Sequence, residues 1–126
     1  MYFLDDRIYM GQFNNGLLDG YGEFLWPDGK KYFGYYKDDN KHGFGIFVWS
    51  TNPLKAYIGF WKDGRQHGIG IMVNSSIVKH GLWSEGKKEL FFKSTWEMKK
   101  HATSEQLIYM KFLQKDISYI VDFFLI

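Results

Sequence analysis

The chain contains no cysteine and only two prolines among its 126 residues. Without cysteine the fold has neither a disulfide framework nor a thiolate metal site, which fits a reducing compartment. A dominant charge is missing too, because 16 Lys and Arg are balanced by 14 Asp and Glu, leaving a formal charge of +2. A charge this weak and evenly spread does not predict binding to nucleic acid.

Long apolar runs are also missing. The most apolar segment, 117–126, carries Asp122 and is shorter than the roughly 20 residues that a transmembrane helix needs. The N-terminal residues MYFLDDRIYM lack the basic leader and the apolar core of a signal peptide. We therefore expect an intracellular chain that does not cross a membrane.

The chain is rich in aromatic residues and glycine. Aromatics make up 21% of it and glycine occurs 14 times, a mixture that favours short strands joined by tight turns over a helix bundle. The length corresponds to one domain.

Aromatic residues and glycines recur with a period of about 23 residues. The repeat-defining glycines are Gly11, Gly22, Gly34, Gly45, Gly59, Gly70 and Gly81. Tyr9 precedes the first pair, and Tyr32 and Tyr57 occupy the same place in the next two copies. Each period reads as a hairpin, with two alternating strands around a polar turn such as NNG or KDG. One hairpin is not stable alone, so we expect an elongated, twisted antiparallel sheet of stacked hairpins.

The period sets the expected organisation. It predicts a partial repeat at 1–8, repeats at 9–31, 32–56 and 57–78, a half repeat at 79–92, and a helical segment at 93–126. Because residues 1–8 align with the end of a repeat, either the protein begins inside a repeat or the chain is part of a longer array. The sequence leaves both open.

The spacing Y-x-G-x-[FWY]-x-x-G-x-x-x-G-x-G resembles the MORN (membrane occupation and recognition nexus) repeat over about residues 1–92. Four positions depart from this pattern. Asp39 replaces a turn glycine, Lys79 replaces the leading tyrosine of the fourth copy, and Leu90 and Phe92 replace its second-strand glycines. We expect the array to end in that half repeat.

After residue 93 the composition becomes helical. Ser94 with Glu97, and Thr103 with Gln106, have the spacing of capping boxes. They predict a short helix at about 95–101 and a second one from Ser104 to near the end. The residues predicted to dock the second helix are Leu107, Met110, Ile117, Val121 and Phe124. This segment either caps the sheet or offers a docking surface for a partner or a second copy, and the two roles are compatible.

The sequence has few candidates for catalysis or metal binding. His42 and His67 occupy equivalent repeat positions, and the first copy has Asp19 there, so these side chains are candidate metal ligands. A repeated polar residue beside a turn is, however, expected from the repeat itself. No nucleophile elbow, phosphate loop or HExxH motif occurs. We predict no enzyme activity, no metal and no cofactor.

Strand alternation predicts two ladders on opposite faces of the sheet. One contains Tyr9, Phe13, Tyr32, Tyr36, Tyr57, Trp61 and Trp83, and the other contains Met10, Gln12, Phe33, Tyr35, Ile58, Phe60 and Leu82. A face left open would be an aromatic groove for a partner helix. The candidate partner-binding residues are Tyr35, Phe33, Phe60, Trp61, Tyr36, Tyr57 and Trp83, although a core role is the commoner one for such rings.

The resemblance implies a protein-interaction scaffold in a cytoskeletal, ciliary or membrane-associated assembly, with a helical segment or a cytoskeletal or motor protein as partner. Two alternatives stay open. In the first alternative, the chain binds anionic phospholipid through its lysines, although these are interleaved with acids. In the second, it is the accessory repeat region of a larger enzyme such as a lipid kinase. We expect no nucleic-acid partner, and self-association remains open.

Overall fold

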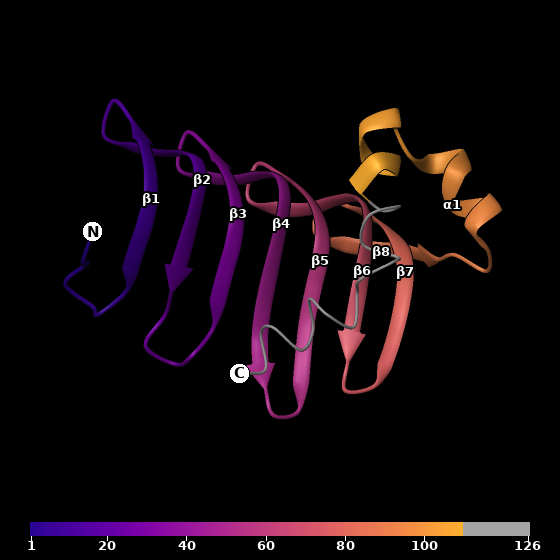
Figure 1. Ribbon diagram of the computed structural model, residues 1–126, viewed down its shortest axis with the longest axis horizontal. Helices are drawn as coiled ribbons and strands as arrows, with labels where there is room; N and C mark the ends of the chain where they lie inside the picture. Colours follow the sequence, from indigo (N-terminus) through magenta and orange to yellow (C-terminus); the bar gives the residue numbers. More distant parts are fainter. Residues whose placement is uncertain (110–126) are drawn as a thin grey trace.

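The computed structural model describes residues 1–109. Eight antiparallel strands form one sheet and lie in chain order along the longest axis of the molecule (Figure 1). The strands are β1 (Ile8–Asn14), β2 (Leu17–Leu25), β3 (Lys31–Lys37), β4 (Asn40–Thr51), β5 (Leu54–Lys62), β6 (Arg65–Asn74), β7 (Ile77–Ser84) and β8 (Lys87–Phe91). The fold class expected from the repeat, a mainly β array of tandem hairpins, is confirmed.

The hairpins close through turns whose two central residues both have positive φ. Asn15 and Gly16 have φ values of 52° and 80°, and Asp63 and Gly64 have values of 50° and 84°. This backbone suits the twist of a two-residue hairpin, and it explains the Asn-Gly and Asp-Gly pairs. Asp39 takes the place of a turn glycine at φ 71°, a conformation that Asp tolerates better than most residues.

Each turn is hydrogen-bonded to the hairpin before it. The amide of Asp39 donates to the carbonyl oxygen of Leu18 at 2.9 Å, and the amide of Gly64 donates to that of Lys41 at 2.9 Å. The Asp39 carboxylate also accepts from the Leu18 amide at 2.7 Å. Successive hairpins are therefore joined at their turns as well as along their strands.

Residues 1–8 form a turn like the one that connects the first two hairpins. The Phe3 amide donates to the Arg7 carbonyl at 2.8 Å, and the Trp26 amide donates to the Lys30 carbonyl at 3.0 Å. An Arg7–Asp5 ion pair at 2.8 Å likewise corresponds to a Lys30–Asp28 pair at 3.0 Å. The first residues thus have the local structure of a repeat's end.

A buried tyrosine organises each of the first three hairpins. Gly59 of β5 pairs with Gly70 of β6, and the ring of Tyr57 lies across this pair. A Cβ atom placed on Gly70 would stand 2.4 Å from the Tyr57 hydroxyl oxygen, so both positions require glycine. The Tyr57 hydroxyl donates to the carbonyl oxygen of Phe60 at 3.0 Å, where the strand register shifts. A β-bulge leaves such a carbonyl without a ladder partner, and the tyrosine satisfies it.

The same arrangement occurs twice more. Tyr32 lies across the Gly34–Gly45 pair and donates to the carbonyl of Tyr35 at 3.0 Å. Tyr9 lies across the Gly11–Gly22 pair and donates to the carbonyl of Gln12 at 2.9 Å. All three tyrosine side chains are fully buried.

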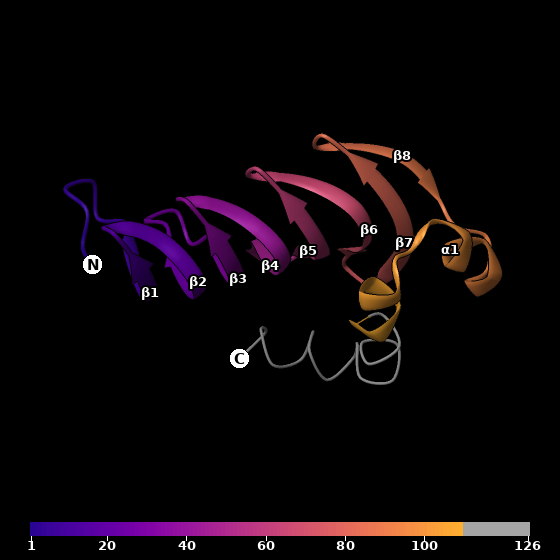
Figure 2. The ribbon, with the colours of Figure 1, turned by 90° about the horizontal axis from the view of Figure 1, so that it is seen from above.

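The opposite face carries an aliphatic core beneath the helical segment. Helix α1 (Thr95–His101) packs beside β6 and β7, on one side of the C-terminal strands (Figure 2). Its Met98 is buried in a core that includes Ile58, Ile69 and Ile71. A second helical segment begins at residue 104 and continues to the last described residue, and its Leu107 joins the same core.

Both predicted capping pairs form. The Glu97 amide donates to the Ser94 hydroxyl at 3.2 Å. Thr103 and Gln106 bond each other reciprocally, at 3.1 and 3.0 Å. The predicted docking residues Met110, Ile117, Val121 and Phe124 lie outside the described residues. Within residues 1–109, no helix has the length and apolar character to cross a membrane.

We expect Tyr57→Phe to lower the free energy of unfolding by about 1–2 kcal/mol, because it leaves the buried Phe60 carbonyl without a donor. Urea denaturation measures this. The control is Tyr2→Phe, whose side chain is 83% exposed and which we expect to change stability by less than about 0.5 kcal/mol. Equal losses in the two variants would contradict the role of the hydroxyl.

Candidate partner-binding surface

One face of the sheet, called here the aromatic face, is defined by Tyr9, Tyr32 and Tyr57 and the rings around them. Ring contacts along strands and between neighbouring hairpins have edge-to-face geometry, which aromatic quadrupoles favour. Tyr9 meets Tyr36 at 5.6 Å, Tyr32 meets both Tyr36 and Trp61, and Tyr57 meets Trp61 at 5.3 Å. These rings are at most 7% exposed, so they form a closed base to the face.

The structure separates the seven predicted partner-binding residues into two groups. Tyr36, Tyr57, Trp61 and Trp83 belong to the base of the aromatic face, where they are buried. The other three, Phe33, Tyr35 and Phe60, lie on the opposite face.

The three on the opposite face differ in depth. Phe60 is buried against Phe44 and Tyr109, with ring centroids 5.8 and 5.7 Å away. Tyr35 is 44% exposed and meets Tyr21 edge to face, while Phe33 is half-buried. The seven residues therefore do not form one surface.

A second set of rings on the aromatic face is half-buried, and we call it the rim. It consists of Trp26, Phe47, Trp49 and Phe91. Trp26 and Phe47 lie 5.4 Å apart, and Phe47 and Trp49 lie 4.8 Å apart. Sequence reasoning did not select these rings, although Trp26 and Trp49 share the strand parity of Gly22 and Gly45. No described helix packs on this face.

Lysines stand over the rim. The Lys41 Nζ lies 5.5 Å from the ring centres of Tyr32, Phe47 and Trp61, and 5.8 Å from that of Trp26. These distances are in the range of cation–π interactions. The Lys55 Nζ lies 5.6 Å from Trp49.

A similar arrangement occurs at the C-terminal end of the rim. The Lys79 and Lys88 ammonium groups lie 4.9 and 4.2 Å from Phe91. None of these four lysines takes part in an ion pair with another residue of the described range 1–109; the ion pairs there are Arg7–Asp5 and Lys30–Asp28.

Burial lowers the pKa of Lys41, because a cation removed from water is penalised unless a carboxylate compensates it. The aromatic rings compensate it only in part. The aromatic face therefore has a buried base, a half-buried rim, and cations that no described acid neutralises.

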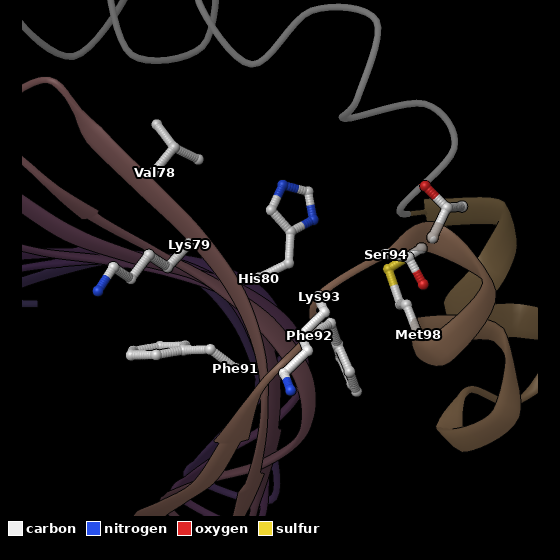
Figure 3. A pocket seen from close by; sticks show the side chains of 9 residues that line it. Val78, Lys79, His80, Phe91, Phe92, Lys93, Ser94 and Met98 are labelled. Carbon is white, nitrogen blue, oxygen red and sulfur yellow. The ribbon is translucent and has the colours of Figure 1, made fainter.

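The opposite side of the last hairpin has a pocket of about 480 Å³, lined in part by His80, Phe92 and Met98. Figure 3 shows His80 and Phe92 on one side of the β7–β8 ribbons, and Lys79 and Phe91 on the other. Burial lowers the pKa of His80 and so favours its neutral form. The pocket lining contains no carboxylate that could work with this imidazole as an acid–base pair.

In two of the three repeats, the side chain at the Asp/His position accepts a hydrogen bond from a backbone amide. The Asp19 carboxylate accepts from the Asp38 amide, and the His67 Nδ1 accepts from the Glu85 amide, both at 3.4 Å. In each case the donor belongs to the turn of the next hairpin. Among residues 1–109, no three His, Asp or Glu side chains gather in a metal-binding arrangement.

A family model of the MORN repeat matches three consecutive segments, residues 9–31, 32–52 and 57–76. Each segment covers one of the hairpins that contain a buried tyrosine. The hairpin formed by β7 and β8 follows the last match. A comparison with curated proteins found no match to the chain.

Burial of Tyr57 raises the pKa of its hydroxyl well above the ordinary value of 10.0. The unfolded chain therefore loses this proton first, and stability that is present below pH 10 is lost as pH rises beyond it. Tyr57→Phe lowers the free energy of unfolding at pH 8, and we expect this loss to be smaller by about 1 kcal/mol at pH 11.

Urea denaturation of the wild type and the variant across this pH range measures the effect. Ile71→Val is the control, because it alters a fully buried side chain that does not titrate. Its cost should stay constant with pH. A Tyr57→Phe cost that also stays constant would contradict the expected linkage.

Proposed function

Because the chain belongs to the MORN repeat family, we propose that it is a non-catalytic scaffold that holds a protein segment on its aromatic face. The observation that carries this proposal is the rim. Half-buried tryptophan and phenylalanine rings lie on a base of buried rings and leave part of their own surface exposed to solvent. Aromatic side chains held in this way are the usual anchors of protein interfaces.

A non-catalytic role is supported by what the polar side chains do. Asp19, Asp39 and His67 accept hydrogen bonds from backbone amides of neighbouring hairpins. Asp5 and Asp28 pair with basic residues in connecting turns. These contacts stabilise the array, which is the usual role of polar side chains beside turns.

The proposed partner is a helical segment of a cytoskeletal or motor protein, in a cytoskeletal, ciliary or membrane-associated assembly. A single layer of sheet provides a long surface on which a helix can bury an apolar stripe. The second candidate is an anionic phospholipid. It is favoured by the lysines over the rim, which form no ion pair with any residue of the described range 1–109. Attachment to a membrane usually needs a denser cluster of cations.

We expect Trp26→Ala combined with Trp49→Ala to weaken binding of the partner at least tenfold, because anchors at an interface commonly contribute more than about 1.4 kcal/mol each. An affinity pull-down from the native cell lysate, quantified by mass spectrometry, compares this variant with the wild type. Tyr21→Ala is the matched control, since its ring is exposed on the opposite face.

The partner should remain bound to the Tyr21→Ala variant. Equal recovery on the wild type and on the double tryptophan variant would contradict the proposal. Co-sedimentation with anionic vesicles at moderate salt runs in parallel. Salt-sensitive binding to vesicles, with no protein recovered on the wild type, would favour the lipid candidate.

A further inference from the structure

Resting on the proposed function, we infer that the segment held on the aromatic face is acidic, with carboxylates that pair with Lys41 at one point and with Lys79 and Lys88 at another. An acidic partner is a narrower requirement than the proposed function, which needs only a protein segment on the aromatic face. It follows from where the cations stand and from what surrounds them.

Lys41 is the first cation. Its Nζ is surrounded by four rings at 5.5 to 5.8 Å, and no ion pair joins it to an acid within residues 1–109. An ammonium group has three donors, which rings satisfy poorly. A half-desolvated cation without a carboxylate costs stability, so its position is best explained by an anion that arrives from outside.

The repeat register shows that this is a special position. Lys41 lies opposite Tyr36 on β3, and the equivalent residues of the other hairpins are Leu18, Gln66 and Lys88. A lysine therefore occurs in the second and fourth hairpins, with an uncharged residue in the hairpin between them. The repeat itself does not demand a cation here.

Lys79 adds a second cation at the far end. It replaces the buried tyrosine of the earlier hairpins, and its Nζ approaches the same ring, Phe91, that Lys88 approaches. Figure 3 shows Lys79 and Phe91 on the same side of the strands. Two ammonium groups beside one ring repel each other, and a carboxylate between them would relieve that repulsion.

The distance between Lys41 and the Lys79–Lys88 pair sets the length of the expected partner segment. Four strand spacings of about 4.8 Å separate equivalent positions in alternate hairpins, or roughly 19 Å. A helix spans that distance in about 13 residues. Uncharged Gln66 and half-buried Met72 lie in the intervening hairpin. The expected segment thus carries acidic residues near both ends and apolar residues between them.

A peptide fits this arrangement better than a lipid surface. The cations stand at two separated points and lie among half-buried rings, whereas a layer of headgroups is best bound by clustered cations that protrude into it. Carboxylates on a folded segment are able to reach both points at once.

The test is selection from a display library of random peptides about 16 residues long, long enough to span the two points. The wild type, a Lys41→Met, Lys88→Gln variant, and a Lys37→Gln, Lys99→Gln variant are used as bait. The last variant removes the same charge from two exposed lysines that stand over no ring, so it controls for net charge. Replacing Lys41 removes a desolvated cation, so the first variant should unfold at an equal or higher urea concentration.

We expect peptides selected on the wild type to contain at least twice the Asp and Glu of the input library. Their affinity should fall at least tenfold on the Lys41→Met, Lys88→Gln variant and stay unchanged on the control. An absence of acidic enrichment, or equal binding to the two lysine variants, would overturn the inference.

The outcomes also separate this inference from the proposed function. Selected peptides without acidic enrichment that are lost on the double tryptophan variant would refute the acidic partner and leave the scaffold role intact. Failure of the wild type to select any peptide would contradict both. If phosphatidylserine vesicles bind through Lys41 and Lys88 and no acidic peptides are selected, the inference is overturned and a lipid headgroup is the ligand.

Discussion

The contact between a tyrosine ring and a pair of glycines on adjacent strands is the interaction on which the rest of the sheet depends. At Gly59 and Gly70 the strands present no side chain to the aromatic face, and the ring of Tyr57 fills that space. Its hydroxyl reaches the Phe60 carbonyl, which the register shift leaves without a strand partner. The glycine pair, the bulge and the tyrosine thus require one another. Without the tyrosine there would be a void and an unsatisfied carbonyl at the bulge, and without the glycines the ring would clash with a side chain.

This mutual requirement explains why so much of the fold was predictable from the sequence. The glycines and tyrosines recur because each repeat needs the same local geometry, so their period reveals the hairpins directly. Turn residues with positive φ and the two capping pairs are also local signals. The helix predicted at about 95–101 occurs at Thr95–His101, with Ser94 as its N-cap. Strand alternation assigned the two ladders to opposite faces, and their buried members do lie in two separate cores.

How deeply each aromatic ring is buried was not predictable from the sequence in the same way. Alternation tells which face a residue occupies, but it does not tell how far neighbouring hairpins cover it. Trp61 is buried because Tyr32 and Tyr57 flank it from two hairpins, whereas Trp26 and Trp49 stand near strand ends, where fewer rings surround them. That difference arises from packing between repeats, a tertiary property. For the same reason the sequence showed Lys41 as one of many lysines and did not reveal the rings around it.

The division between base and rim separates the rings that stabilise the sheet from those proposed to bind a partner on the same face. In the first three hairpins a tyrosine belongs to the base, where replacing it would weaken the array. In the last hairpin a register shift places Phe91 opposite Gly81, one residue from the Phe92 that the repeat spacing predicted there. Because this partner is not a glycine, there is no bare strip for a tyrosine to cover. Lys79 stands there, and its ammonium group lies over the Phe91 ring. Where the structural demand for tyrosine ends, the position becomes free to carry a charge, and the proposed acidic partner can be bound there without cost to the core.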